Sequence, residues 1–343
     1  FTVPGESFLP ALNGLYDHKN KIDVITCRHE SGAANMAEAW GKLTGFPGVV
    51  FVTRGPGACH ASIGVHTAMQ DSSPMVMFIG QIHSKHKGRE AFQEVDYYKM
   101  FAQPFSKAIF EIKNAKSIPN IVQKAFYIST SDRPGPVIIS LPEDILEQYA
   151  RYKSIKALKY NFSKISPLKI TNLLNKIEKS KKPLIIAGGG DWDKYGAKDL
   201  EHFANANKIP YAVSFRRQSI VNNNNNYYIG DLSTSVDPKL INSVKESDLI
   251  LVVGARLGEM TTGGYTTIKP NQKNKIIHVY PDKKELGKVY KPIIGIKANS
   301  SIFSKMIKDK KIKNIKWERW SNSCRKNYIE YSTPPKYSSE PDM

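Results

Sequence analysis

Short apolar runs that alternate with helical stretches constrain the fold of this chain more than any other feature. Within residues 1–145 the runs are mostly apolar rather than alternating, which is typical of strands buried on both faces of a parallel sheet. These runs span residues 22–27, 49–53, 75–80, 108–112 and 137–141. Helical patterns between them span residues 31–43, 58–70 and 118–130. The alternation predicts an α/β domain with a parallel sheet.

A second series of the same kind follows a polar, lysine-rich connector. Its expected strands span residues 183–187, 211–215, 249–254 and 276–280, and its expected helices 168–178, 196–207 and 238–246. We predict two consecutive three-layer α/β domains with mainly parallel sheets. The expected boundaries are a first domain at 1–147, a linker at 148–166, a second domain at 167–310, and a tail and linker at 311–343.

The two ends of the chain predict a segment of a longer protein. The chain opens at Phe1 without an initiator methionine, and residues 334–343 are rich in proline and serine, like a linker toward another domain.

Composition argues against several classes of partner. The formal net charge is +19, and residues 305–326 are the most basic stretch, yet lysines occur throughout and no nucleic-acid-binding motif accompanies them. We therefore expect no nucleic-acid partner. The sequence contains neither an apolar run of about 20 residues nor a signal peptide, so we expect no membrane partner and a cytoplasmic location. Cys27, Cys59 and Cys324 are too far apart in sequence to indicate a zinc site or a disulfide framework.

Two neighbouring segments carry candidate chemistry. Glu30 comes directly after an expected strand and begins an expected helix, which is where ligands bind in parallel sheets. By itself this position is explained as well by the favourable interaction of a carboxylate with the helix dipole. Gly55-Pro56-Gly57 joins the next strand to a helix, and glycines there let backbone approach a ligand closely. This turn has neither the GxGxxG spacing nor a Walker lysine, so alone it does not identify a ligand.

An ordered series of motifs is more specific. It comprises His29-Glu30, Arg54-Gly55-Pro56-Gly57-Ala58, Gln70-Asp71-Ser72-Ser73-Pro74, Gly80-Gln81, Ala91-Phe92-Gln93-Glu94 and Arg133-Pro134-Gly135-Pro136-Val137. This series resembles the pyrimidine-binding domain of the acetolactate synthase-like thiamine-diphosphate family. The second domain resembles the family's Rossmann-like central domain at Pro183–Gly190, Ile209-Pro210 and Val252–Arg256. The resemblance covers roughly residues 1–300.

The resemblance implies roles for seven residues. Glu30 matches the glutamate that hydrogen-bonds the aminopyrimidine ring of thiamine diphosphate and so activates the thiazolium carbon, which makes it the expected catalytic residue. Further cofactor contacts are expected from Pro56, His60 and Gln93, although acetolactate synthases usually have an asparagine at the position of His60. Substrate contacts are expected from Gly5, Glu6 and Phe92. Simple packing explains Phe92 equally well.

The resemblance also concerns Mg²⁺ and FAD. In the family, Mg²⁺ and the cofactor diphosphate bind at a Gly-Asp-Gly that is followed by asparagine. The nearest match here, Gly190-Asp191 ahead of Asn222, has Trp192 in place of the second glycine. We therefore expect no metal ligands in this sequence, and Mg²⁺ to be bound by a C-terminal domain that the sequence lacks. FAD is not expected, because residues 214–218 do not resemble the family's flavin loop and Tyr280 replaces an aspartate.

The expected activity is decarboxylation of a 2-oxo acid such as pyruvate with carboligation to a second carbonyl, by a homodimer or homotetramer. This segment alone is expected to be inactive. Two alternatives within the family remain, a 2-oxo-acid decarboxylase and an acyl-CoA lyase. An alternative of a different class is a cofactor-free binding or regulatory module without the diphosphate-binding domain.

Overall fold

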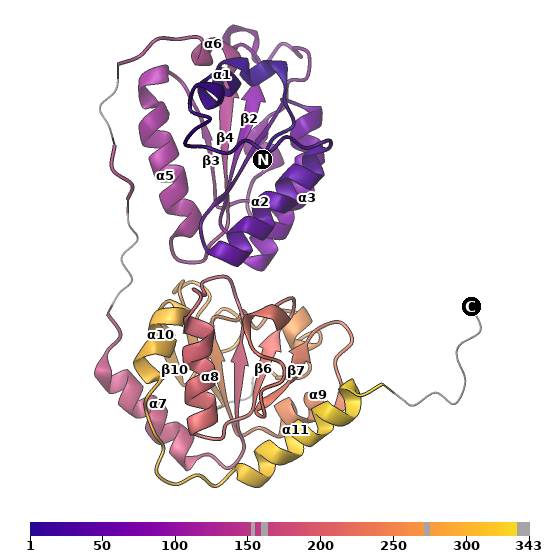
Figure 1. Ribbon diagram of the computed structural model, residues 1–343, viewed down its shortest axis with the longest axis vertical. Coiled ribbons are helices and arrows are strands. Elements are labelled where there is room, and N and C mark those ends of the chain that lie inside the picture. The colour runs from indigo at the N-terminus through magenta and orange to yellow at the C-terminus, as the bar shows by residue number, and fades with distance from the viewer. Residues whose placement is uncertain (152–154, 159–163, 271–274, 335–343) are drawn as a thin grey trace, which may run out of the picture. The chain divides into compact units, whose positions relative to one another are not determined.

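A computed structural model describes residues 1–151, 155–158, 164–270 and 275–334 of the chain (Figure 1). The chain divides into two compact units, Phe1–Asn161 and Phe162–Met343, and the division falls within the connector expected at 148–166. Each unit has a parallel sheet with helices on both faces, which confirms the predicted α/β class. Among the residues described, no helix is both long and apolar enough to cross a membrane.

The sheet of the first unit has four parallel strands in the order β1-β2-β4-β3. These are β1 (Gly48–Val52), β2 (Met75–Gln81), β3 (Ala108–Glu111) and β4 (Pro136–Pro142). All residues of β2 and β4 are buried, because both strands lie inside the sheet and both faces are covered. This burial explains why the run at 75–80 is apolar throughout and why Ser140 is the one polar residue of the run at 137–141.

Two pairs of helices cover the faces of this sheet (Figure 1). Helices α2 (Glu30–Thr44) and α3 (Pro56–Asp71) pack on one face through small side chains such as Ala34 and Ala61. Helices α1 (Leu9–Asp17) and α5 (Ile118–Thr130) pack on the other. Two short helices, α4 (Tyr97–Met100) and α6 (Glu143–Leu146), complete the unit.

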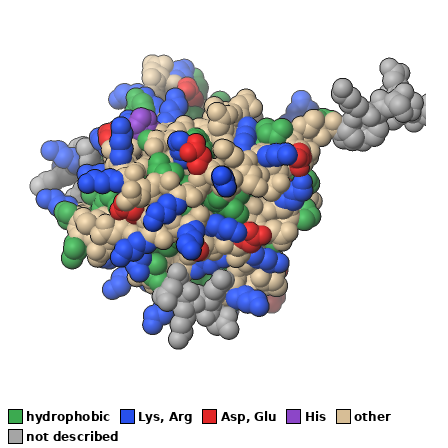
Figure 2. Space-filling model, turned by 90° about the horizontal axis from the view of Figure 1, so that it is seen from below, with side chains coloured by type: hydrophobic (Ala, Val, Ile, Leu, Met, Phe, Trp, Pro, Cys, Tyr) green, Lys and Arg blue, Asp and Glu red, His purple; other side chains and the backbone are tan. Residues whose placement is uncertain are grey.

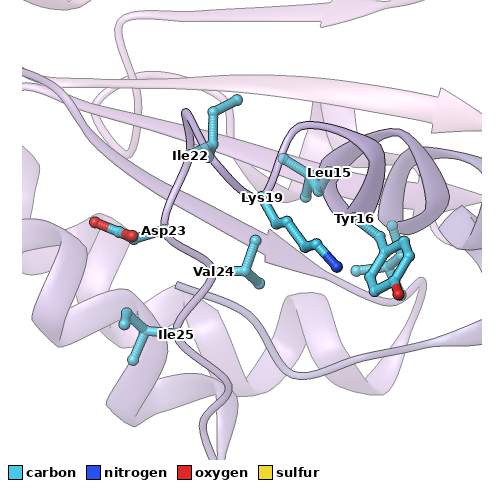
Figure 3. A pocket seen from close by; sticks show the side chains of 8 residues that line it. Leu15, Tyr16, Lys19, Ile22, Asp23, Val24 and Ile25 are labelled. Carbon is cyan, nitrogen blue, oxygen red and sulfur yellow. The ribbon is translucent and has the colours of Figure 1, made fainter.

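The strand expected at residues 22–27 is wrong. Backbone pairing there is limited to an isolated bridge between Thr2 and Thr26, and Thr2 bridges to Phe51 of β1 on its other side. Ile22 and Ile25 are 47% and 48% exposed, so neither face of the segment is covered as a buried strand would be. With α1, residues 22–25 instead line an open pocket of about 460 Å³ (Figure 3).

The second unit has six parallel strands in the order β10-β9-β8-β5-β6-β7. They are β5 (Pro183–Ala187), β6 (Tyr211–Ser214), β7 (Tyr228–Leu232), β8 (Leu249–Val253), β9 (Ile276–Tyr280) and β10 (Ile294–Lys297). The chain runs outward from β5 to β7 and then returns to β8 on the other side of β5. The strand order therefore reverses between β5 and β8, as in doubly wound nucleotide-binding folds.

Helices also cover both faces of the second sheet. One face carries α7 (Pro167–Lys179), α8 (Gly196–Ala206) and α10 (Ser300–Ile307), and the other carries α9 (Pro238–Glu246) and residue Cys324 of α11 (Glu318–Ser332).

The expectation that residues 311–343 form only a tail and linker is wrong for the part that the structure describes. Trp317 is 1% exposed in the core of the second unit. The fully buried Asn207 fixes this segment, because its Oδ1 accepts from the Ile312 amide, its Nδ2 donates to Lys310 O, and its carbonyl accepts from Trp317 Nε1. Residues up to 332 thus belong to the second unit, whereas 335–343 lie outside the described residues.

Basic side chains are spread among others on the face that Figure 2 shows. Acidic and apolar side chains lie between the Lys and Arg side chains there. Several lysines of the second unit pair with glutamates, among them Lys182 with Glu246 at 2.7 Å and Lys239 with Glu330 at 2.6 Å. The expectation of no nucleic-acid partner stays a prediction.

Candidate functional site

The turn at residues 53–57 connects β1 to α3 and is built for close packing. Gly55 has φ +58°, and a Cβ there would lie 2.9 Å from the Cβ of Gln93. A Cβ on Gly57 would lie 2.9 Å from Thr53 Cγ2. Pro56 is exposed at the start of α3, where its missing N–H costs the helix no hydrogen bond. The sequence thus needs glycine on both sides of Pro56 because neighbouring segments approach the turn so closely.

Glu30 lies at the first position of α2, beside this turn. The preceding residue, His29, caps the helix by accepting a hydrogen bond from the Ser31 amide. The Glu30 side chain is 12% exposed, and its Oε2 accepts from His60 Nδ1 of α3 at 3.0 Å. Its Oε1 lies 3.6 Å from the position that a Cβ on Gly57 would take. The packing of α2 on α3 therefore holds a shielded carboxylate against the glycine turn.

Gly5 and Glu6 reach the same turn from the N-terminal segment. A Cβ on Gly5 would lie 2.5 Å from Thr53 Cβ. Glu6 is 73% exposed, and its Oε1 accepts from Arg54 Nη2 at 3.3 Å. The largely buried Arg54 also donates from Nη1 to Glu143 Oε2 at 3.1 Å, while its buried Nε has no hydrogen-bond partner among the residues that the structure describes. Arg54 thus ties the N-terminal segment to the turn and to α6.

Residues 92–97 close the other side of the turn. Gln93 has φ +65° and packs against Gly55, whereas the adjacent Phe92 is 74% exposed. The Tyr97 hydroxyl accepts from the Gly55 amide and donates to Gly80 O, both at 3.1 Å. Burial raises the pKa of Tyr97 to about 12, so the phenol keeps the proton that this second bond needs.

Six of the seven expected residues lie at the turn, contact it, or contact Glu30 beside it. They are Gly5, Glu6, Glu30, Pro56, His60 and Gln93. Phe92 lies next to them in sequence but is mostly exposed. Sequence reasoning missed the structural parts of Arg54 and Tyr97. The only sequence signal for Arg54 was its place before the glycine turn, and nothing in the sequence connected it with Glu143, 89 residues away.

Three side chains of this site also form a possible set of metal ligands. The ligand atoms of His29, Glu30 and His60 all lie within 4.8 Å of one another. The expectation of no metal ligands in this sequence stays a prediction, and His60 joins the other two side chains only through the packing of α3 on α2. Sequence spacing alone gives no such signal.

In the second unit, Asp191 has a structural position. Its Oδ2 accepts from the Ser300 amide and its Oδ1 from the Ser300 hydroxyl, both at 2.7 Å, so it closes the N-terminal end of α10. Burial of the carboxylate raises the pKa of Asp191 to about 6. Nearby, a Cβ on Gly189 would overlap the carbonyl oxygen of Gly254. These glycines therefore pack on each other, and the helix end that could receive a phosphate already holds a carboxylate.

Two pockets lie away from the glycine turn. The pocket in Figure 3 is lined by Leu15, Tyr16, Lys19 and residues 22–25. A second, of about 790 Å³, is lined by α5 side chains such as Phe126 and by Gln148 and Leu158. None of the expected site residues is among their lining residues.

Comparison with known proteins identifies both domains. Residues 1–100 match the model of the thiamine pyrophosphate enzyme, N-terminal TPP binding domain. Residues 170–307 match the thiamine pyrophosphate enzyme, central domain.

Acetolactate synthase large subunits are among the similar proteins. The probable large subunit of Methanococcus aeolicus is 33% identical over 305 residues, which are 86% of this chain and 50% of that protein. The large subunit of Buchnera aphidicola subsp. Schizaphis graminum is 34% identical over 333 residues, 94% of this chain and 57% of that protein. The Escherichia coli isozyme 2 large subunit is 29% identical over 299 residues, 87% and 54% respectively. The chain thus spans about half the length of these curated relatives. It belongs to the thiamine pyrophosphate enzyme family and contains that family's N-terminal and central domains.

Proposed function

We propose that this chain is part of a thiamine-diphosphate-dependent enzyme that decarboxylates a 2-oxo acid and joins the product to a second carbonyl, as in acetolactate synthase. The observation that carries the proposal is the Glu30 carboxylate, which is shielded at the start of α2 and held against the glycine turn. The names of the relatives support pyruvate as the 2-oxo acid.

The residues at the turn fit the aminopyrimidine end of the cofactor. An aminopyrimidine offers N–H donors, and Glu30 presents a carboxylate acceptor whose Oε1 lies on the side of Gly57. Pro56 and Gln93 would flank the ring at the same turn. When bound, thiamine diphosphate supplies a carbon nucleophile for the ketone of the 2-oxo acid. We assign its diphosphate and Mg²⁺ to the part of the enzyme outside this chain, since the relatives are about twice as long.

Glu30 has the proton-handling part in this proposal. The Glu30 carboxyl group gives a proton to the ring nitrogen of the aminopyrimidine, accepts a hydrogen bond from the N–H so formed, and takes the proton back afterwards. The bond from His60 Nδ1 to Oε2 orients the carboxylate. The bond from Arg54 to Glu6 holds the loop with Gly5 where a substrate carbonyl would approach, which supports substrate contacts by Gly5, Glu6 and the exposed Phe92.

We also propose that the complete enzyme is a homodimer or homotetramer. Large apolar side chains of α2 and the residues that follow it are exposed: Trp40 is 51%, Leu43 78% and Phe46 71% exposed. Ile63 of α3 is 56% exposed. Such surface is typical of an interface between subunits.

Flavin is not part of the proposal. The glycines that would approach a flavin diphosphate pack on each other, and the Asp191 carboxylate stands at the end of α10, where it would repel an anion at pH 7.

Product analysis tests the proposed activity. The complete enzyme, with thiamine diphosphate and Mg²⁺, is incubated with pyruvate, and carbon dioxide, acetolactate and acetaldehyde are quantified. We expect acetolactate with one carbon dioxide per acetolactate formed. Acetaldehyde as the main product would indicate a decarboxylase, and no turnover of any 2-oxo acid by a folded, cofactor-loaded enzyme would contradict the proposal.

A further inference from the structure

The ends of α2 and α3 bring together two imidazoles and a carboxylate. His29 comes from the N-cap of α2, Glu30 from its first turn, and His60 from the first turns of α3. One ligand atom from each residue lies within 4.8 Å of those from the other two, and the two imidazole centroids are 4.6 Å apart. We propose that these three residues bind a transition-metal cation of the zinc class, at a site separate from that of the cofactor's Mg²⁺.

The distances suit a tetrahedral ion after small side-chain rotations. Zinc bonds of about 2.0–2.1 Å place the ligand atoms of a tetrahedron roughly 3.3 Å apart. His60 Nδ1 and Glu30 Oε2 are 3.0 Å apart, close to this edge. His29 is exposed and the His60 side chain is 52% exposed, so both rings can turn toward the ion without moving the backbone. A fourth position remains open to water.

The donor set selects the metal. Two imidazole nitrogens and one carboxylate suit zinc, whereas Mg²⁺ prefers oxygen ligands. Ser31 Oγ lies 2.7 Å from His29 Nδ1. If the ion binds Nε2 of His29, the hydroxyl oxygen of Ser31 accepts the proton on Nδ1 and fixes the ring, as outer partners of metal-bound histidines do. The Ser31 amide gives up its bond to His29 in this state.

A metal ion bound at this site would prevent the Glu30 carboxylate from binding the cofactor. A carboxylate bound to the cation cannot also accept a hydrogen bond from the aminopyrimidine, so metal and cofactor exclude each other. This consequence rests on the proposed function, whereas the metal site rests on the three side chains alone.

A zinc titration in the absence of thiamine separates the two claims. The metal-free chain competes with a chromophoric zinc indicator at pH 7.5, and we expect one equivalent of saturable binding. His60→Ala and Glu30→Gln should each weaken binding by more than about tenfold, because even loss of an outer partner costs 10–100-fold. The matched control is His202→Ala, which removes an exposed histidine 3.5 Å from Asp309 in a pair with no third ligand among the described residues.

Cobalt provides a second readout. Co²⁺ at the site should show the strong visible absorption of tetrahedral coordination, and this absorption should disappear in His29→Ala. Circular dichroism checks the fold of each variant, and His60→Gln replaces His60→Ala if the latter unfolds. The proposal is overturned if the wild-type chain shows no saturable binding, or if the histidine variants bind zinc as tightly as His202→Ala.

Discussion

Gly64→Ala tests the packing of α3 on α2 that holds the candidate site. A Cβ on Gly64 would lie 2.5 Å from the Cβ of Ala34, 2.7 Å from its carbonyl carbon and 2.9 Å from its carbonyl oxygen. The closest of these is about 0.9 Å short of ordinary contact at 3.4 Å, and two of the three atoms are backbone. The helices must therefore part. Overpacking costs about 1–3 kcal/mol, and alanine recovers about 0.5–1 kcal/mol in a helix. Because backbone cannot rotate away, we expect a net loss of about 1–2 kcal/mol.

Hydrogen–deuterium exchange by mass spectrometry measures this loss in the first unit alone. Amides of α3 should exchange about 5–30-fold faster in Gly64→Ala than in the wild type. The matched control is Gly14→Ala in α1, where the added Cβ meets nothing within 4 Å and exchange should be no faster. Exchange in α3 of Gly64→Ala as slow as in the wild type would refute the reasoning, since it would mean that α2 and α3 are not in tight contact there.

Three further predictions concern buried polar groups. Burial lowers the pKa of His278 to about 4, so between pH 6.5 and 4 the folded state binds fewer protons than the unfolded state and acid removes about 3 kcal/mol of stability. In urea titrations, the free energy of unfolding of His278→Gln should fall less between pH 6.5 and 4 than that of the wild type. An unchanged pH dependence would contradict the lowered pKa of His278. Arg54→Met should lower the free energy of unfolding by only about 1 kcal/mol, because the exposed Glu6 regains water when the ion pair is lost. It should also speed amide exchange at residues 5–8, and unchanged exchange would rule out the link from Arg54 to this segment. Asn207→Ala should cost about 2–4 kcal/mol by leaving buried groups unpaired. Limited proteolysis should then cut near Trp317, and resistance equal to that of the wild type would contradict this anchor.

Uniform apolar runs predicted the central strands well. The run at 75–80 forms most of β2 (Met75–Gln81), a strand whose residues are all buried because both of its faces are covered. The run at 22–27 is also rich in apolar residues, although it includes Asp23 and Thr26, but it has no partner strand beyond Thr2, and composition does not report pairing. The sequence pattern did not predict β10, because this edge strand is short and only half-buried and so shows no uniform apolar run.

The candidate site likewise contains residues that local sequence predicts and contacts that only the packing of distant segments creates. Glu30 and the turn around Pro56 could be predicted because each follows the expected end of a strand within a short stretch of sequence. The link from Arg54 to Glu143, and the meeting of His29 with His60, depend on how strands and helices pack over separations of 89 and 31 residues. The sequence around Arg54 and His60 does not indicate these distant partners, so only the packed structure shows that Arg54 pairs with Glu143 and that His60 meets His29 and Glu30.

The central claim is that Glu30 handles the proton that activates the cofactor. The most direct measurement is NMR of deuterium exchange at the thiazolium C2 of thiamine diphosphate bound to the complete enzyme. Glu30→Gln should slow this exchange at least ~100-fold. Glu147→Gln, at an exposed position after α6, should leave the rate unchanged. An exchange rate in Glu30→Gln equal to that of the wild type would contradict the account.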